Sequence, residues 1–229
     1  MSEELLIKPI AHIYTDFTEK FGIPRQSGLV EELKGRIIFE PQYRRAEALK
    51  ELDGFSHIWL IWHFSQAETN DFSPTVRPPR LGGNRRVGVF ASRSPFRPNS
   101  LGLSCVKLEG IDYEGENAPV IYVSGIDILN GTPIFDIKPY IPVADLKADA
   151  AEGYTADTKN YFADVDFPDG LLSKIPENKR SALIKILKND PRPSYKADEA
   201  MRYGLSFAGF NIVFDADGKK IKVKSVEKI

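Results

Sequence analysis

The stretch that most constrains the fold runs from Phe55 to Ser65 and reads FSHIWLIWHFS. It is the most hydrophobic run of the chain, yet far shorter than the roughly 18 apolar residues that a membrane helix needs. Because it is apolar on both faces, it should be a strand in the middle of a sheet. Such a strand needs partners, and we expect them at Leu5–Tyr14, Gly35–Glu40, Leu103–Ile111, Val120–Ile128 and Ile134–Ile141.

Few helices interrupt these strands, and the links between them are short. The only long helix expected in this part covers Gln42–Leu52, which follows Pro41 and places Ala46, Leu49 and Leu52 on one face. Many strands joined by short turns predict a barrel or a strongly curved sheet. We therefore expect a mainly β fold over residues 1–145, either a β-barrel or a strongly curved sheet.

A change in composition follows the last of these strands. Residues Pro142–Asp157 are rich in Ala, Asp and Gly, which is typical of a linker. Beyond it we expect a strand at Tyr161–Phe167, an amphipathic helix at Pro176–Lys188, and a hairpin between Tyr203–Phe214 and Ile221–Val226. The pattern predicts a small α/β domain over residues 146–229. Basic side chains on the outer face of its helix could add to an RNA surface, although a solvated face is the commoner meaning.

Positive charge is concentrated between Thr75 and Leu103. No acidic residue occurs between Asp71 and Glu109, although the net charge of the chain is only −1. Guanidinium groups offer paired donors to phosphate and carboxylate, and the prolines of this stretch stiffen its loops around a short apolar strand, Val87–Ala91. We interpret it as an active-site segment that binds anions; a plain solvated surface is the alternative. The candidates for contacts with RNA phosphates, a cofactor carboxylate or a second subunit, with structural ion pairs as the alternative for some of them, are Arg77, Arg80, Arg85, Arg86 and Arg97.

Several classes of protein are disfavoured by what the sequence lacks. A single cysteine, Cys105, rules out an internal disulfide and fits a reducing compartment. Three scattered histidines, with no metal-ligand spacing, argue against a metal site. No signal peptide or membrane span is indicated, so we expect a cytoplasmic protein. No GxGxxG follows a strand, which argues against a Rossmann-type cofactor domain.

The motif PRLGGNRRVGVFASRSPFRPNSLGLS resembles the signature of the TsaA-like family of tRNA methyltransferases. Further matches occur at Pro24–Gln26, His63–Phe64, Asp127–Tyr140 and Asp190–Tyr195. The resemblance implies a barrel that binds S-adenosylmethionine (SAM) and methylates N6 of threonylcarbamoyl-adenosine at position 37, in the anticodon loop of threonine tRNA. It also implies a homodimer in which arms of one subunit complete the site of the other.

Residue by residue, the resemblance implies a set of cofactor contacts: Pro24, Arg25, Gln26, His63, Phe64, Arg93, Leu103, Asp127, Ile128, Leu129 and Asn130. SAM carries a cation, a carboxylate, ribose hydroxyls and a flat ring. We expect Arg93 to be its electrostatic partner, and Asp127 and Asn130 to accept from the ribose or the amine. Phe64, Leu103 and Ile128 would line the slot for the ring. Without the resemblance, we would interpret Pro24–Gln26 as a turn with an exposed arginine.

The amine to be methylated belongs to a urea-like group and is a weak nucleophile, so a base should help. Asp190 and Tyr195, in the sequence DPRPSY, are the candidate catalytic residues. In the alternative interpretation this segment is a rigid loop in which Asp190 caps a turn and pairs with Arg192.

Two other functions fit the arginines. One is a non-catalytic RNA-binding module, and the other is a hydrolase of a small phosphorylated substrate. Titration with SAM separates both from a methyltransferase.

Overall fold

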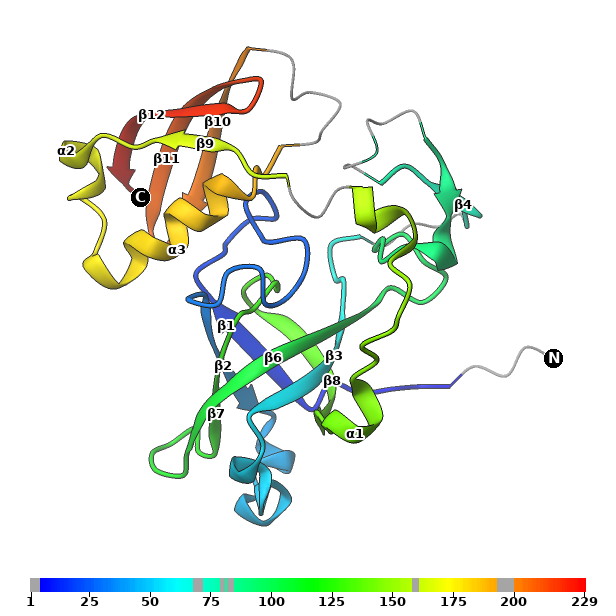
Figure 1. Cartoon of the computed structure of the whole chain (residues 1–229). Helices are drawn as coiled ribbons and strands as arrows, with labels where there is room; N and C mark the ends of the chain where they lie inside the picture. Colours follow the sequence, from blue (N-terminus) through cyan, green and yellow to red (C-terminus); the bar gives the residue numbers. More distant parts are fainter. Residues whose placement is uncertain (1–4, 68–71, 79–80, 82–84, 158–160, 193–199) are drawn as a thin grey trace.

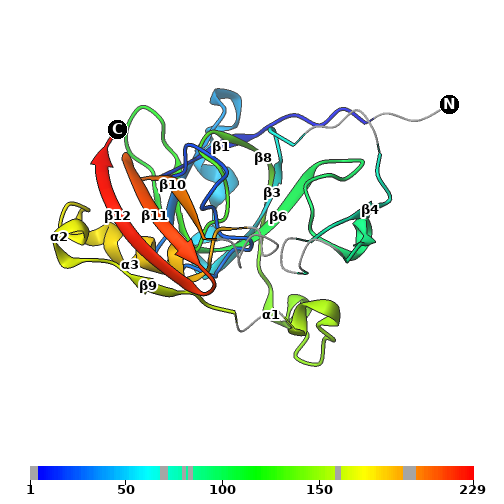
Figure 2. The same ribbon diagram turned by 90° about the horizontal axis from the view of Figure 1, so that it is seen from above.

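The computed structural model describes residues 5–67, 72–78, 81, 85–157, 161–192 and 200–229. A six-stranded barrel, a C-terminal sheet with a helix, and a short two-stranded arm make up the chain (Figure 1). The arm and the C-terminal sheet both lie beyond the same end of the barrel, the arm toward one side and the sheet toward the other (Figures 1 and 2).

The barrel closes in the order β1-β2-β7-β6-β3-β8, and every pairing is antiparallel. Closure leaves no strand edge of the barrel exposed. The predicted mainly β fold with a barrel is therefore confirmed. Its strands are β1 (Ala11–Thr15), β2 (Lys34–Phe39), β3 (His57–His63), β6 (Leu101–Asp112), β7 (Val120–Ser124) and β8 (Thr132–Pro139).

Strand β3 lies between β6 and β8, as its hydrophobicity predicts. Ile58, Leu60 and Trp62 point into the barrel and are buried. The outward residues are half-buried, and Trp59 donates from Nε1 to Oδ2 of Asp145 at 3.1 Å. Asp145 belongs to the short helix α1 (Pro142–Asp145), so α1 covers part of the outer face of β3.

The predicted helix Gln42–Leu52 was wrong. The segment forms three 3-10 turns, η1 (Pro41–Tyr43), η2 (Ala46–Leu49) and η3 (Leu52–Gly54). The backbone is extended at Arg45 and left-handed at Glu51, which has φ 66°. Leu49 is the only buried residue of the three turns, so no apolar face supports a longer helix.

The arm also differs from the expectation. Val87–Ala91 is not one strand: β5 (Val87–Gly88) pairs with β4 (Thr75–Val76), and the 3-10 turn η5 (Val89–Ala91) follows at once. Val89 is buried while Phe90 is 73% exposed, so the arm has a very small core of its own.

The C-terminal sheet has the order β10-β11-β12-β9, and β9 runs parallel to β12. The predicted helix is confirmed as α3, whose apolar residues pack into the core that includes the sheet. Its elements are β9 (Asp164–Asp166), α2 (Asp169–Leu172), α3 (Glu177–Lys188), β10 (Met201–Phe207), β11 (Phe210–Asp217) and β12 (Lys220–Lys228).

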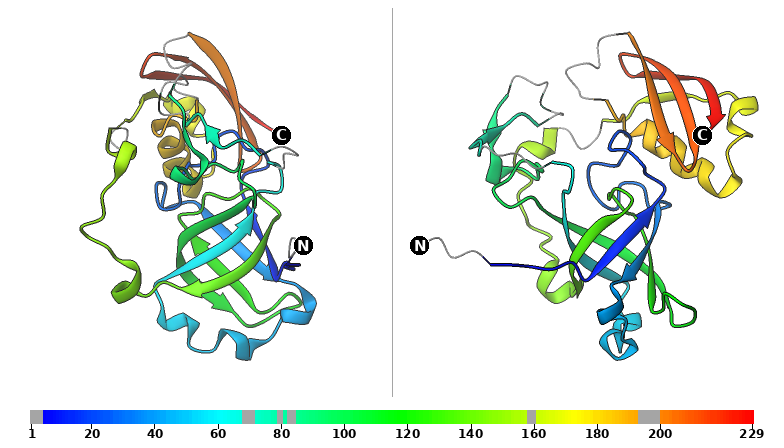
Figure 3. Two further views of the ribbon diagram at one scale, coloured as in Figure 1. Left: turned by 90° about the vertical axis from the view of Figure 1, so that its right-hand side faces the viewer. Right: turned by 180° about the vertical axis from the view of Figure 1, so that it is seen from behind.

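The bounds of two predicted strands in this domain were wrong. The strand expected at Tyr161–Phe167 covers only Asp164–Asp166. Tyr203–Phe214 is two strands, because Ala208 and Gly209 both have positive φ and turn the chain between β10 and β11. The expected hairpin at Gly218 joins β11 to β12. The predicted linker holds α1 and the 3-10 turn η6 (Gly153–Asp157), and it runs along one side of the molecule from barrel to C-terminal sheet (Figure 3).

The long loop between β1 and β2, residues 16–33, lies between the barrel and the C-terminal domain (Figure 1). Its Phe17 ring centroid is 5.5 Å from that of Phe207. Buried residues of the barrel, of this β1–β2 loop and of the C-terminal sheet form one continuous hydrophobic cluster. The loop that carries Pro24–Gln26 is thus packed from both sides.

Candidate cofactor site and arginine arm

Asp127 is the centre of the candidate site. It follows β7, beyond Gly125, whose φ of 72° ends the strand and turns the chain. The hydroxyl of Ser104, an inward residue of β6, donates to Asp127 Oδ1 at 2.6 Å. The same hydroxyl oxygen accepts from Trp62 Nε1 at 3.0 Å. A relay of hydrogen bonds from β3 through β6 therefore orients this carboxylate.

Burial of Asp127 raises its pKa from 3.8 to about 6. Hydrogen bonds from Ser104 and the backbone of Ser27, together with the charge of Arg93, offset part of this effect. Desolvation penalises the charged form, and the nearby donors do not fully compensate for it. A cationic ligand placed against this carboxylate would complete that compensation.

Arg93 and Gln26 reach this site from two other parts of the chain. Arg93 follows η5 of the arm, and its Nη1 donates to Oε1 of Gln26, which belongs to the β1–β2 loop. The guanidinium is exposed and acts electrostatically on Asp127. An arginine, an amide and a half-buried carboxylate from three distant segments are thus brought together.

Phe64 joins the group through Trp62. It directly follows β3, and its ring centroid is 4.2 Å from that of Trp62 at an interplanar angle of 56°. Its backbone N–H donates to the carbonyl of Ser100 at 2.9 Å, which ties the end of β3 to the start of β6. The side chain is half-buried, so part of the ring remains available to a ligand.

The residues after Asp127 hold the segment in place. Ile128 is fully buried in the core, and Leu129 packs against the same cluster. Asn130 Oδ1 accepts from the backbone N–H of Thr15 at 2.9 Å. In this chain, then, the Ile128 and Asn130 side chains make structural contacts.

Leu103 and His63 lie on the outer face of the barrel. Leu103 pairs with Ile61 across β6 and β3 and points opposite to Ser104; it is 54% exposed. The ring of His63 is 6.0 Å from that of Phe135, centroid to centroid. These two predicted contacts are therefore separated from Asp127 by the barrel wall within one chain.

The first part of the predicted cofactor segment faces the C-terminal domain. Pro24 is buried. Arg25 Nη2 donates to the carbonyl of Arg192 at 2.7 Å and to that of Asp190 at 3.2 Å. Only Gln26 of this tripeptide reaches the Asp127 group.

Asp190 is buried and paired. Its Oδ1 accepts from Nε of Arg192 at 2.8 Å, and its Oδ2 accepts from Nη2 of Arg192 and from the hydroxyl of Tyr161, both at 3.0 Å. The side chain of Arg192 is also buried; burial alone lowers its pKa, but the hydrogen bond and charge of Asp190 raise it above the usual value. The pairing matches the structural alternative for this loop. Tyr195 lies outside the described residues.

The arginines of the arm fall into two groups. Arg77 and Arg85 are exposed, and Arg86 is exposed while donating from Nε to Thr75 Oγ1 at 2.8 Å. Arg97 instead donates to the carbonyl of Ser92 at 2.7 Å and lies 5.8 Å from the ring centroid of Phe90, so it shapes the arm. Arg80 is not among the described residues.

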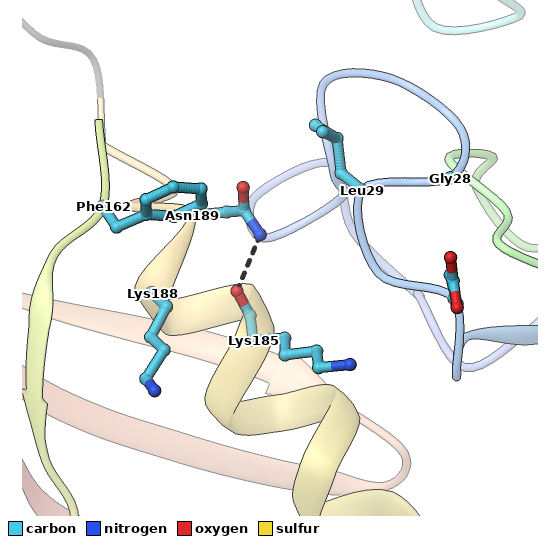
Figure 4. Close-up of a pocket in the computed structure, with 7 residues that line it drawn as sticks. Gly28, Leu29, Phe162, Lys185, Lys188 and Asn189 are labelled. Atoms are coloured by element: carbon cyan, nitrogen blue, oxygen red, sulfur yellow. Dashed lines mark hydrogen bonds between the residues drawn. The ribbon is translucent and has the colours of Figure 1, made fainter. Parts of the chain in front are cut away.

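A separate cleft of about 340 Å³ lies between the β1–β2 loop and the end of α3 (Figure 4). Among its lining residues, Asn189 Nδ2 donates to the carbonyl of Lys185 at 2.9 Å. None of the predicted catalytic or cofactor residues that the structure describes lines it. Its residues are Gly28, Leu29, Glu31, Phe162, Lys185, Lys188 and Asn189.

The sequence did not predict two residues of the site, Ser104 and Trp62, which are its hydrogen-bond donors. The available signal was a serine at an inward position of a strand, between Gly102 and Val106. Trp62 was assigned to the core, where it indeed lies, but its indole N–H also serves the site.

Within the described ranges, no three His, Cys, Asp or Glu side chains are grouped so that they could hold a metal ion. Over the same residues, no helix has the length and apolarity to cross a membrane.

Comparison with known proteins identifies relatives over nearly the whole chain. Residues 12–146 match the tRNA-methyltransferase O N-terminal domain, and residues 163–229 match the TrmO C-terminal domain. The tRNA (adenine(37)-N6)-methyltransferase of Escherichia coli (strain K12) is 36% identical over 211 residues, covering 89% of each chain. A putative S-adenosylmethionine-dependent methyltransferase of Pseudomonas aeruginosa is 41% identical over 207 residues, covering 87% of each.

The fold agrees with these matches. A crystal structure of TrmO from P. aeruginosa superposes with a TM-score of 0.80 at 32% identity, covering 100% of this chain and 99% of that one. The resemblance noted in the sequence is thereby confirmed, together with the enzyme class, a methyltransferase that uses SAM. The chain belongs to the tRNA-methyltransferase O family.

Proposed function

We propose that this chain methylates N6 of threonylcarbamoyl-adenosine at position 37 of threonine tRNA, in the cytoplasm and as a homodimer. The observation that carries the proposal is the half-buried carboxylate of Asp127, which is held by Ser104 and lies near Arg93, the partner of Gln26, at one end of a closed barrel.

The residues present fit SAM. A carboxylate with a raised pKa suits a cationic ligand, a guanidinium suits a carboxylate, and a half-buried aromatic ring suits a purine. We assign Asp127 to the amine or ribose, Arg93 to the carboxylate and Phe64 to the ring. When bound, SAM supplies a methyl group already activated by the sulfonium.

The chain has to align donor and acceptor and to handle one proton. Holding the two in line can remove several kcal/mol of the barrier, about 7–11 in favourable cases. Asp190 and Tyr195 are our proposed proton-handling pair. Because Asp190 already accepts hydrogen bonds from Arg192 and Tyr161, we assign it the positioning role and Tyr195 the role nearer to the amine.

The arm offers contacts both to the tRNA and to a second subunit. Arg77, Arg85 and Arg86 present charge to phosphates. Near them, Phe72, Phe90 and Phe96 are 59%, 73% and 50% exposed, which is unusual for side chains of this size in solution. A second copy placed against the arm and the outer face of β6 would cover them and would bring Leu103 and His63 next to a partner.

We also propose that the catalytic unit ends near residue 145 and that the C-terminal domain occupies residues 146–229.

The test combines two measurements on the purified protein. Titration calorimetry should show SAM binding, and nucleoside mass spectrometry should detect a methyl group added to threonylcarbamoyl-adenosine in threonine tRNA. Binding of tRNA without SAM binding would instead support the RNA-binding module, and competition by a small phosphate ester would support the hydrolase. Sedimentation that detects only monomer would refute the dimer.

A further inference from the structure

The aromatic residues at the start of the β1–β2 loop are inserted into the C-terminal domain. Phe17 is fully buried against Phe207, and the ring of Phe21 stacks on that of Tyr203 with centroids 6.0 Å apart. Gly22 has φ 97°, and a Cβ at this position would lie 2.0 Å from Leu205. This half of the loop is therefore shaped by the C-terminal sheet.

Polar contacts attach both ends of the loop to the same domain. Asp16 pairs with Lys179 of α3, and Glu32 pairs with Lys185 and accepts from Ser181 at 2.9 Å. Burial alone raises the pKa of Glu32, but the hydrogen bonds from Lys185 and Ser181 lower it below the usual value.

These pairs change the interpretation of the basic face of α3. Lys179 and Lys185 hold the loop, and Arg180 donates from Nε to the carbonyl of Ile175 at 2.8 Å. The RNA surface considered for this face is therefore largely replaced by internal contacts. Lys188, the fourth basic residue of this helix, is exposed.

In the middle of the loop, Arg25 binds a rigid turn. It donates to the carbonyls of Asp190 and Arg192, whose side chains form a buried ion pair. Arg192 Nη2 also donates to the carbonyl of Gly218 at 2.6 Å, so the turn is fixed to the β11–β12 hairpin. The two carbonyls that Arg25 needs are thus presented by a preformed turn.

The next two residues of the loop belong to the candidate site. Gln26 donates from Nε2 to the carbonyl of Arg25 and accepts from Arg93, and the backbone of Ser27 bonds to Asp127. We propose that Arg25 is a positioning residue: held by the Asp190–Arg192 turn, it places Gln26 and Ser27, and the C-terminal domain thereby sets the affinity for SAM without touching it. This inference rests on the proposed placement of SAM beside Gln26, Arg93 and Asp127.

The test is a double-mutant cycle on the full-length chain, with the dissociation constant for SAM measured by calorimetry. Arg25→Met removes the guanidinium that makes both hydrogen bonds and keeps most of the aliphatic stem. We expect about tenfold weaker SAM binding, and the KM for SAM should rise by a larger factor than kcat falls. The second perturbation is the double variant Asp190→Ala/Arg192→Met, which removes both charges of the buried ion pair and so loosens the turn. It should weaken SAM binding by about the same factor as Arg25→Met.

The triple variant decides between positioning and direct contact. If Arg25 acts through the turn, adding Arg25→Met to the Asp190→Ala/Arg192→Met variant should not weaken SAM binding further. If the two effects multiply, Arg25 contacts the ligand itself and the inference is overturned. Arg25→Lys, which can restore one donor, should recover part of the affinity.

A matched control separates positioning from general destabilisation. Val226 on β12 is 2% exposed and is separated from β10 by β11, so Val226→Ala should lower Tm and leave SAM affinity unchanged. Equal weakening by this control would overturn the inference.

Hydrogen exchange of the wild-type protein gives an answer even if a variant does not fold. Because coupling between sites is reciprocal, SAM should slow exchange at the Gly218 turn, which contacts Arg192. Unchanged exchange there would contradict the coupling. Absence of SAM binding by the wild type would refute the proposed function instead.

Discussion

Ser104 donates its hydroxyl hydrogen to Asp127 at 2.6 Å and accepts that of the Trp62 indole at 3.0 Å, so a half-buried carboxylate is held from two neighbouring strands. The three residues come from β3, from β6 and from the segment after β7. This relay makes the ionisation of Asp127 a property that experiments on stability and binding can both detect.

The first prediction concerns stability against pH. The folded-state pKa of Asp127, about 6, lies above its usual 3.8, so the folded protein binds this proton more tightly than the unfolded chain. The resulting stabilisation is complete below the unfolded pKa and is lost as pH rises through 6. Asp127→Asn should therefore raise the free energy of unfolding by up to about 3 kcal/mol at pH 8, with a much smaller gain near pH 4. Urea unfolding at both pH values measures this.

The exposed Asp149 supplies the control, because Asp149→Asn should change stability equally little at both pH values. A gain for Asp127→Asn that is the same at pH 4 and pH 8 would mean that the carboxylate is not strained by burial.

The second prediction concerns SAM binding against pH. If the ionised carboxylate faces a cation, the affinity for SAM should rise by up to about tenfold per pH unit below pH 6, where the free carboxyl is protonated. Above pH 6 the affinity should level off. Calorimetry between pH 5 and 8 measures the profile. The Asp127→Asn variant should bind more weakly and show a flat profile in this range; a wild-type profile that is already flat would argue against Asp127 as the partner.

The third prediction tests the close approach of β6 to β3. A Cβ on Gly102 would lie 2.2 Å from the Trp62 ring, so Gly102→Ala should displace the indole that donates to Ser104 and cost about 1–3 kcal/mol. The matched control in the same strand is Gly110→Ala, where a Cβ meets nothing within 4 Å. Denaturant unfolding and Trp fluorescence provide the readouts, and equal stability of the two variants would disprove the packing argument.

The fourth prediction concerns the arm. Arg85 and Arg86 are exposed, and replacing either arginine should remove one phosphate partner, weaken tRNA binding and reduce the salt slope by about one. Filter binding of Arg85→Gln and Arg86→Gln across a salt series measures both quantities. Lys220→Gln, an exposed charge on β12, should behave as wild type. Variants that keep the full slope would place the RNA elsewhere.

The fifth prediction concerns proton handling. Tyr195→Phe should lower kcat by about a hundredfold while SAM affinity is kept, since a positioned proton acceptor contributes on that scale. Asp190→Ala should lower both kcat and Tm, because it removes the proposed positioning carboxylate and, with it, the ion pair of the buried Arg192 side chain. Tyr113→Phe, at a 49% exposed position, is the neutral control. Full turnover in both Tyr195→Phe and Asp190→Ala would end the catalytic assignment.

The sequence alone was enough to predict a mainly β fold, the family and α3, because these depend on local patterns. Alternation along β6, short turns and the apolar spacing of α3 are encoded within each segment. The helix expected over Gln42–Leu52 failed, because the segment had residues with helical propensity but found no surface on which to bury an apolar face.

Tertiary structure decided which predicted residues meet. Arg25 lies far in sequence from Asp190 and Arg192, and only folding shows that it binds the carbonyls of these two residues. Leu103 and Ser104 are adjacent, yet a strand directs them to opposite sides of the barrel wall, so a motif containing both does not place both at one site. The sequence determined the kinds of side chain available and their local elements. Their convergence on Asp127 depended on barrel closure and on a loop packed against another domain, which are long-range contacts that no local pattern encodes.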